Sequence, residues 1–239
     1  LGQKHAFLIG MYERKQVKAR LSGTKLDERY NTAALRMPGG RDAPWVVYRK
    51  VFLIPFGEYL PVPLDEEKYL PQKFKMRPGL MEGEESKHSS MLEYKDLKFA
   101  PFLCYEGILP DHVLAVCDGE RPDVLVSLTN DSWFGDTWEP HQHLNFTRFR
   151  AVELRAPLVR ATNTGISAFV SITGDVAAED RLGLFEEGVL VMDVPILDRG
   201  PTVYMRFGHW FPTLALILAV LGLFSALMRP PPVIVGEVD

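Results

Sequence analysis

Short apolar runs alternate with polar segments along most of the chain. Runs of about four to eight residues rich in β-branched and aromatic side chains are typical of strands, and apolar residues repeating every three or four positions are typical of helices. The pattern predicts strands at residues 6–11, 30–37, 44–48, 123–129, 166–172, 176–178 and 189–194, and helices at residues 112–117 and 141–155. Residues 173–175 (Thr-Gly-Asp) predict a hairpin turn. The mixture indicates an α/β or α+β fold.

The pattern changes near the C-terminus, where residues 210–228 carry no formal charge and are mostly Leu, Ile, Ala, Val and Phe. A helix over this segment would be roughly 28 Å long, close to the thickness of a bilayer core. Trp210 and Phe211 suit the interface of a membrane, and Arg229 follows the segment. We expect a transmembrane helix, with a buried core helix or hairpin as the alternative. Arg206 and Arg229 flank it equally, so charge does not decide its orientation.

Residues 61–96 lack any sustained periodicity and are rich in Pro, Lys, Glu and Met. A loop of this length is usually functional or disordered. One interpretation is a solvated loop. The other is a mobile cover whose apolar side chains contact lipid, namely Leu60, Leu64, Tyr69, Leu70, Phe74, Met76, Leu80 and Met81.

The composition sets broad limits. The 239 residues are enough for one large domain with a full core, and a formal net charge of −4 gives no electrostatic reason to expect nucleic acid as a partner. Two cysteines are too few for a disulfide framework. Cys117 is expected in the core, with a bond to Cys104 as the minor alternative. Nothing in the sequence requires an oligomer, and we expect a monomer.

Cys104 follows an apolar run and precedes Tyr105 and Glu106. A lone cysteine after a strand is usually a small buried hydrophobe. Here Gly107 interrupts the strand and Pro110 opens the predicted helix, so strand, cysteine, sharp turn and helix would form an elbow that exposes one side chain. A thiolate is a nucleophile, and a nearby cation favours its formation.

Several ordered motifs resemble the carbon–nitrogen hydrolase (nitrilase) superfamily and, within it, the bacterial apolipoprotein N-acyltransferase family. They are Tyr48-Arg49-Lys50 with Pro55-Phe56-Gly57-Glu58-Tyr59, Cys104-Tyr105-Glu106, residues 130–135 (NDSWFG), 140–143 (PHQH), 148–154 (RFRAVEL), 160–165 (RATNTG) and 204–210 (YMRFGHW). The resemblance extends from about residue 7 to residue 228.

This resemblance implies a four-layer α-β-β-α sandwich followed by one transmembrane helix. It divides the chain into a catalytic domain at residues 1–203, a juxtamembrane segment and helix at residues 204–229, and a tail at residues 230–239. The family's general-base glutamate, with the first strand and helix of the sandwich, would precede the strand that begins near Phe7, and Glu13 does not match its motif. We therefore expect an N-terminally truncated domain that is inactive alone.

The resemblance also implies roles for individual residues. Cys104 would be the nucleophile, Lys50 would stabilise the oxyanion, and Glu58 would orient the lysine or relay protons. Glu106 and Tyr105 would support the nucleophile. Asn130 and Trp133 would shape the pocket wall. The alternatives without a role in the site are a surface lysine for Lys50, a solvated acid for Glu58 and an ordinary core residue for Trp133.

No cofactor and no metal are expected. His141 and His143 form a His-x-His pair with no third ligand nearby, which is a weak metal signal, and no glycine-rich phosphate loop is present. The pair would more simply begin the helix at residues 141–155.

The function implied by the resemblance is acyl transfer from a membrane phospholipid, through a cysteine thioester, to the N-terminal amine of an apolipoprotein's diacylglyceryl-cysteine. It also implies a bacterial inner-membrane protein, multi-pass in its full length, with a periplasmic catalytic domain and a cytoplasmic C-terminus. One alternative is a membrane-tethered amidase that acts on a small amide. Another is an inactive fragment that binds lipid or lipoprotein.

Overall fold

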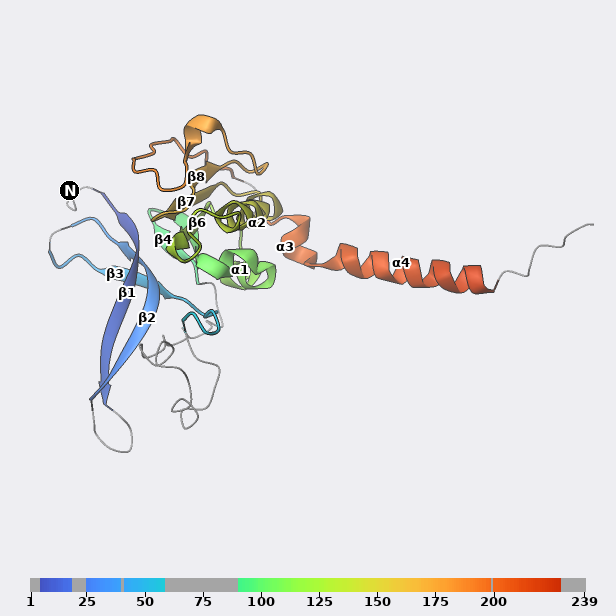
Figure 1. Ribbon diagram of the computed structural model, residues 1–239, viewed down its shortest axis with the longest axis horizontal. Coiled ribbons are helices and arrows are strands. Elements are labelled where there is room, and N and C mark those ends of the chain that lie inside the picture. The colour runs from blue at the N-terminus through green and yellow to red at the C-terminus, as the bar shows by residue number, and fades with distance from the viewer. Residues whose placement is uncertain (1–4, 19–24, 40, 59–89, 199, 229–239) are drawn as a thin grey trace, which may run out of the picture.

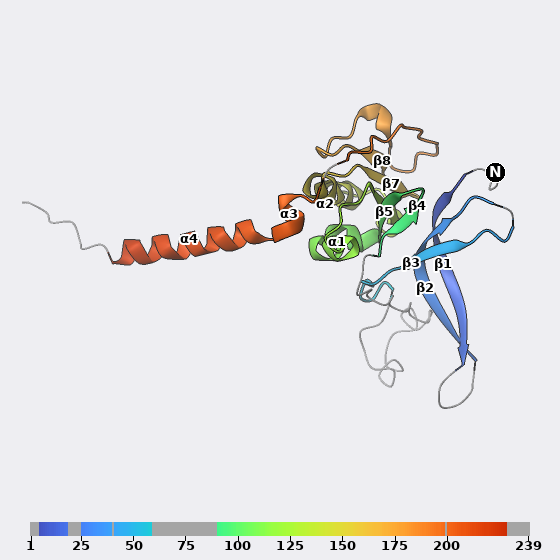
Figure 2. The same ribbon diagram turned by 180° about the vertical axis from the view of Figure 1, so that it is seen from behind.

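The computed structural model describes residues 5–18, 25–39, 41–58, 90–198 and 200–228. They form two β-sheets, two helices that pack on one of these sheets, and a long helix near the C-terminus (Figures 1 and 2). The expectation about a cover formed by residues 61–89 lies outside the described residues. The end of that stretch is not a loop, because Leu92–Tyr94 forms strand β4.

The first sheet is an antiparallel meander in the order β1-β2-β3. Its strands are β1 (Phe7–Lys18), β2 (Lys25–Arg36) and β3 (Trp45–Arg49). All three predicted strands in this region are confirmed, and two are longer than predicted. Gly10, Ala33 and Tyr48 share one row across the sheet and face the interior, where Ala33 and Tyr48 are buried. The sheet therefore delivers Lys50, which directly follows β3, to the interior of the molecule.

The second sheet has six strands in the order β4-β5-β6-β7-β8-β9. They are β4 (Leu92–Tyr94), β5 (Leu97–Leu103), β6 (Val124–Thr129), β7 (Leu158–Thr162), β8 (Ser167–Val170) and β9 (Arg181–Leu182). The central strands β5, β6 and β7 are parallel, and the flanking pairs are antiparallel. A parallel strand covered on both faces reads as a continuous apolar run, as β6 does. The carboxyl ends of β5 and β6 lie at one edge and bear the site residues.

Helices and the first sheet cover opposite faces of the six-stranded sheet. Helices α1 (Pro110–Cys117) and α2 (Glu139–Leu154) pack on one face, where Val113, Cys117 and Leu154 join the core. The first sheet packs on the other face: a Cβ atom placed on Gly10 would lie 3.6 Å from Cβ of Leu128. The described residues thus supply three layers of the α-β-β-α sandwich. Among the described residues, the outer face of the first sheet carries exposed apolar side chains, such as Ile9.

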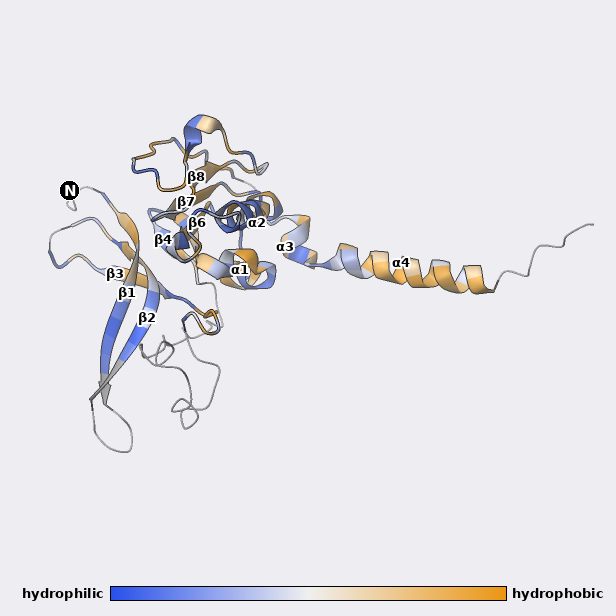
Figure 3. Cartoon of the chain, in the orientation of Figure 1, coloured by the Kyte–Doolittle hydropathy of each residue, from blue (hydrophilic) through white to orange (hydrophobic). Residues whose placement is uncertain are grey.

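The C-terminal part leaves the globular body. Helix α3 (Val203–Phe207) is capped by Thr202, whose hydroxyl accepts a hydrogen bond from the Met205 amide at 3.1 Å. Helix α4 (Trp210–Leu227) then projects away from both sheets and, beyond its first turn, is coloured mainly as hydrophobic (Figure 3). Among the described residues it is the one helix long and apolar enough to cross a membrane, and none of its residues is buried. The helix predicted at residues 210–228 is confirmed.

Two sequence predictions in the second sheet are wrong. Residues 173–175 do form a turn, with the Ser171 amide bonded to the Asp175 carbonyl, but residues 176–178 form no strand and β8 pairs with β9 instead. Residues 189–194 are irregular, and Val191 is 92% exposed. Their apolar residues meet no sheet edge, and a strand needs a hydrogen-bonded neighbour.

Candidate active site

Cys104 sits at a sharp elbow between β5 and a short 3-10 helix, η3 (Cys104–Ile108). Its φ of 51° lies in the left-handed region, which costs a non-glycine residue on the order of 1–3 kcal/mol. The turn is tight because a Cβ atom on Gly107 would lie 2.7 Å from Cγ2 of Thr147. The predicted order of strand, cysteine, turn and helix α1 is confirmed. The elbow leaves the Cys104 side chain partly accessible, between buried Leu103 and exposed Tyr105.

Lys50 is fully buried at the end of β3. Its backbone amide donates to the Asn31 carbonyl at 2.8 Å, which fixes the residue to β2. Its Nζ donates to Oε2 of Glu58 at 2.6 Å. Glu58 is held in turn by the Ile54 amide at 2.9 Å and by Nδ2 of Asn31 at 3.2 Å. A buried charge requires such a partner. The predicted Lys50–Glu58 association is therefore present, and Lys50 is not a surface lysine.

Glu106 is fully buried and joins the two sheets. Its Oε1 accepts hydrogen bonds from the amides of Val51 (2.7 Å) and Phe52 (3.1 Å), just after Lys50. Its Oε2 accepts from the amide of Leu103 (2.9 Å), just before Cys104, and from the Tyr48 hydroxyl (2.9 Å). One carboxylate thus fixes the chain beside the lysine against the chain beside the thiol.

Behind Glu106 lies a second buried group, His112 on α1. Its Nε2 lies 2.8 Å from the Tyr48 hydroxyl and 3.5 Å from Oε1 of Glu106, and its ring meets Phe52 edge-on. Burial, together with the Glu106 charge, raises the pKa of Tyr48 far above its ordinary value, so the phenol stays a donor. These contacts support the carboxylate on the side away from the thiol.

The surroundings of Cys104 shift the pKa of its thiol in opposite directions. Burial raises the pKa of its thiol above the ordinary value, because a thiolate is costly to desolvate. The Lys50 charge, the nearby Thr129 hydroxyl and a hydrogen bond from the Tyr105 amide act to lower that pKa, while Asp131 acts to raise it. The effect of burial is the largest, so the net result is a raised pKa. The thiol is therefore predominantly protonated at neutral pH, and its reaction requires a base.

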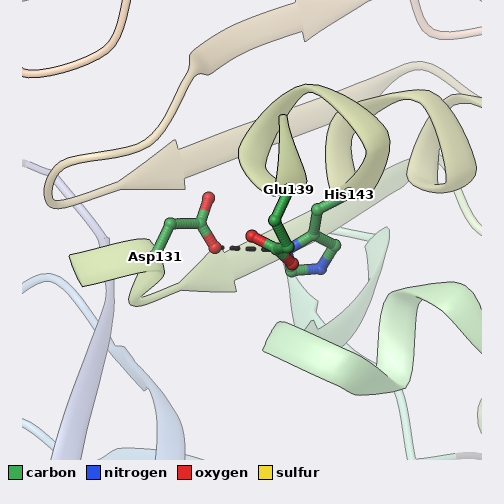
Figure 4. Close-up of side chains that lie close together, drawn as sticks. All are labelled: Asp131, Glu139 and His143. Atoms are coloured by element: carbon green, nitrogen blue, oxygen red, sulfur yellow. Dashed lines mark hydrogen bonds and ion pairs between the residues drawn. The ribbon is translucent and has the colours of Figure 1, made fainter. Parts of the chain in front are cut away.

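A second polar cluster lies at the end of β6, next to the elbow (Figure 4). Asp131, on the 3-10 helix η4 (Asp131–Trp133), is buried. Its Oδ2 accepts from Nη2 of Arg160 at 2.9 Å, and its Oδ1 accepts from the Thr129 hydroxyl at 3.1 Å and lies 3.1 Å from Nδ1 of His143. Burial alone would raise the pKa of Asp131, but the contacts with His143 and Arg160 outweigh it and lower the pKa.

Arg160 completes this cluster from β7. Its guanidinium also donates to the Ser127 hydroxyl at 3.2 Å and to the Ile166 carbonyl at 3.2 Å. Gly165 is needed nearby, because a Cβ atom there would lie 2.1 Å from Oδ2 of Asp131. The other ring nitrogen of His143, Nε2, lies 3.2 Å from the Cys104 carbonyl oxygen. The cluster is thereby connected to the backbone of the nucleophile.

Asp131, Glu139 and His143 are close enough for their ligand atoms to lie within 4.8 Å of one another. The Asp131 carboxylate, however, is already bonded to Arg160 and Thr129. The geometry is that of a hydrogen-bonded network around an ion pair.

A cavity of about 120 Å³ opens beside Cys104. Its wall is mainly apolar and includes Ile54, Tyr105, Ile108, Phe134 and Phe146. Glu139, Gln142 and His143, all from the first turns of α2, supply the polar part. The cavity therefore offers the thiol to an apolar ligand with one polar end.

The structure brings most of the predicted site residues together. Cys104, Lys50, Glu58 and Glu106 form one hydrogen-bonded and electrostatic unit, and Tyr105 lines the cavity. Two predicted wall residues lie elsewhere: Asn130 is exposed and accepts from Nδ2 of Asn163 at 2.6 Å, and Trp133 is 64% exposed. Their role in the pocket stays a prediction.

Other site residues escaped the sequence reasoning. Phe134 and Phe146 line the cavity, and Glu139 stands at its polar end. Arg160 is buried in the middle of a strand, where an arginine needs an acidic partner. An arginine inside the apolar run at residues 158–162 (LVRAT) therefore indicated a buried acidic partner, and in the structure that partner is Asp131. In the sequence, His143 stood out only as part of the His-x-His pair with His141, which is a weak indication of a metal site.

Two parallel strand ends, a thiol at a left-handed elbow and a buried lysine–glutamate pair define an α/β domain equipped for nucleophilic attack by cysteine. The chain belongs to the carbon–nitrogen hydrolase family, whose sequence pattern matches residues 3–202. The fold agrees with this: an amidase from Nesterenkonia sp. superposes with a TM-score of 0.52 at 22% identity, over 87% of this chain and 67% of the amidase.

Within the family the chain is similar to curated proteins named apolipoprotein N-acyltransferase. That of Rhodopseudomonas palustris is 40% identical over 77% of this chain and 33% of its own length. That of Bradyrhizobium diazoefficiens is 38% identical over 83% of this chain and 36% of its own length. The chain thus spans about a third of the length of these relatives.

Proposed function

We propose that this chain carries the thiol site of an enzyme that transfers an acyl chain from a membrane phospholipid to the N-terminal amine of an apolipoprotein. The observation that carries the proposal is Cys104 at its elbow beside buried Lys50, in a cavity with an apolar wall. The names of the relatives support the choice of acyl transfer within the family.

The reaction would proceed in two halves. The Cys104 sulfur attacks the ester carbonyl of the phospholipid, the carbon–oxygen bond breaks, and a lysophospholipid leaves with the proton of the thiol. The amine of the acceptor's diacylglyceryl-cysteine then attacks the thioester, the carbon–sulfur bond breaks, and an amide forms as the thiol regains a proton. This is ping-pong chemistry.

Lys50 would stabilise the negative charge that develops on the carbonyl oxygen in both halves. Removal of one such group typically reduces a rate on the order of a hundredfold or more. Glu58 would hold the lysine in place, since its carboxylate is bonded to Nζ at 2.6 Å. The apolar wall of the cavity suits an acyl chain, and α4 suits anchoring beside a bilayer. We place the protein in a bacterial inner membrane with this domain on the periplasmic side.

The test is a search for the thioester on the natural protein in its own membranes. After incubation with phospholipid, mass spectrometry should find a hydroxylamine-sensitive acyl group on the peptide that contains Cys104. Cys104→Ala should abolish the label, and the matched variant Cys117→Ala should retain it. A label on Cys117 would show that the nucleophile is assigned wrongly.

The acceptor half needs its own comparison. A diacylated lipopeptide with a free N-terminal amine should discharge the thioester and gain one acyl chain. The same lipopeptide with an acetylated N-terminus should leave the thioester intact. Discharge by water alone, at an equal rate with both peptides, would favour a hydrolase over a transferase.

A further inference from the structure

His143 makes two hydrogen bonds that a neutral imidazole cannot make together. Its Nε2 lies 3.2 Å from the Cys104 carbonyl oxygen, and its Nδ1 lies 3.1 Å from Oδ1 of Asp131. A carbonyl oxygen only accepts hydrogen bonds. A neutral imidazole has one N–H donor and one acceptor nitrogen, whereas the imidazolium has two donors. Both contacts are satisfied only if both ring nitrogens carry a proton.

The carboxylate of Asp131 does not supply the missing proton. Its Oδ2 already accepts from Arg160 and its Oδ1 from the Thr129 hydroxyl, so both oxygens act as acceptors. The pKa of Asp131 is lowered by His143 and Arg160 against the effect of burial, so this group is ionised at neutral pH. His143 therefore faces an anion on one side and a carbonyl on the other.

Other charged groups around His143 are consistent with a cation. Glu139, one turn earlier on α2, places Oε1 3.8 Å from Nδ1. Arg160 of β7 contacts Asp131, and the charge of Lys50 acts on the Cys104 thiol. Of these two acids, Asp131 has a lowered pKa and carries the charge that faces His143, whereas burial raises the pKa of Glu139.

The hydrogen bond from His143 to the Cys104 carbonyl can influence the Cys104 sulfur through the peptide group between Cys104 and Tyr105. The peptide between Cys104 and Tyr105 is planar and trans, so its carbonyl and its amide N–H point in opposite directions. The amide N–H of Tyr105 is one of the donors that act on the Cys104 sulfur. A group that fixes the carbonyl end of this plane also fixes the direction of the amide end.

We propose that His143 is a doubly protonated imidazolium that positions the Cys104–Tyr105 peptide, so that the Tyr105 amide stays directed at the reacting sulfur. His143 is then a positioning residue that acts through the backbone and does not touch the substrate's reacting atoms. The role rests on the proposed acyl transfer, because thioester formation at Cys104 is the step that uses this amide. A charged donor also polarises the peptide and strengthens its N–H as a donor.

The protonation state can be measured directly. The natural protein, labelled with 15N-histidine and held in phospholipid nanodiscs, should show a directly bonded proton on both ring nitrogens of His143 at neutral pH. The His143 signal is assigned by elimination, because His→Gln variants of the other histidines each remove one signal and leave His143 in place. One protonated nitrogen, in a protein that forms the thioester, would overturn the proposal. This measurement uses the unmodified site, so it decides the question even if every His143 variant fails to fold.

Kinetics test the positioning role. His143→Gln should slow single-turnover thioester formation by about ten- to a hundredfold, the usual effect of losing a hydrogen bond to a charged group. It should also move the pH midpoint of Cys104 alkylation by iodoacetamide to higher pH, because the Tyr105 amide no longer favours the thiolate. The matched control is His141→Gln, an exposed imidazole two residues away on the same helix. It should leave both quantities unchanged.

Two results separate this inference from the proposed function. Two ring protons on His143 in a protein that never forms a thioester would refute acyl transfer and, with it, the positioning role. A thioester that forms at an unchanged rate in a folded His143→Gln variant, with an unchanged alkylation midpoint, would refute the positioning role and leave acyl transfer standing.

Discussion

The Nζ atom of Lys50 lies 2.6 Å from Oε2 of Glu58, where the lysine side chain has no exposure to solvent and the glutamate side chain retains 12%. The pair is anchored independently at each end, through the Lys50 amide on Asn31 and through Ile54 on Glu58. Two charges held this way cannot relax towards water. The direction of the lysine therefore depends on the glutamate.

Glu58→Gln should impair both activity and stability. It leaves the Lys50 charge buried without its ion pair, and breaking a buried pair costs about 3 kcal/mol or more. We expect acyl transfer to a diacylated lipopeptide to fall on the order of a hundredfold. The matched control is Glu120→Gln, which removes the partner of Lys98 in a much more exposed pair. An exposed pair contributes less than about 1 kcal/mol. Equal effects of both substitutions would show that Glu58 has no special role.

Glu106→Gln should separate the lysine from the thiol. The carboxylate accepts four hydrogen bonds in a fully buried place, and a glutamine amide offers only one oxygen and adds an NH₂ group facing other donors. Each buried group left unsatisfied costs about 1–3 kcal/mol. We expect a lower melting temperature and loss of acyl transfer. Glu93→Gln, on the exposed side of β4, should change neither quantity measurably. A variant of Glu106 as stable and active as the parent would rule out this linking role.

The elbow of Cys104 was predictable because its signals are local. An apolar strand, Gly107 and Pro110 lie close to Cys104 in the sequence, although the turn also packs against Thr147 on α2. The partnership with Lys50 is different, since more than fifty residues separate the two and only the family resemblance suggested it. Local patterns describe an element and its faces. They do not state which distant element will be its neighbour.

The same reasoning explains the errors. Residues 189–194 form an apolar run typical of a strand, yet no neighbouring edge among the described residues pairs with them, and a strand exists only with its partner. His143 and Arg160 become interpretable only when α2 and β7 bring them to Asp131. Trp133 is exposed on the 3-10 turn at the end of β6 and Phe134 lines the cavity, so the place of Trp133 in the pocket wall stays a prediction. Side-chain direction in a short turn depends on its packing.

Cys117 should make stability depend on pH in the alkaline range. Burial raises the pKa of its thiol from about 9 to about 12, so the folded state favours the neutral form. A raised folded-state pKa contributes stability fully below the unfolded value, and this contribution is lost as pH rises from about 9 to about 12. The largest loss in the free energy of unfolding from this group is roughly 4 kcal/mol.

Melting temperatures measured from pH 8 to pH 11 test this dependence. Cys117→Ala should lower stability at pH 8 by removing a well-packed side chain, and its melting temperature should then fall less steeply with pH than that of the parent. Other groups titrate in both proteins, so only the difference between the two slopes is informative. Parallel curves would mean that the Cys117 thiol reaches solvent before the protein unfolds.

Gly165 and Gly200 provide the sharpest comparison for the cluster around Asp131. A Cβ atom on Gly165 would lie 2.1 Å from Oδ2 of Asp131, whereas a Cβ atom on Gly200 would meet no heavy atom within 4 Å. Gly165→Ala must therefore displace the carboxylate from Arg160, and overpacking of this kind costs about 1–3 kcal/mol. Because Asp131 also contacts His143, the displacement should reach Cys104, so thioester formation should slow at temperatures where the variant is still folded. Gly200→Ala should match the parent in melting temperature and in rate. If Gly165→Ala lowers the melting temperature but keeps the parent's rate of thioester formation, the Asp131 cluster serves the fold and not the elbow.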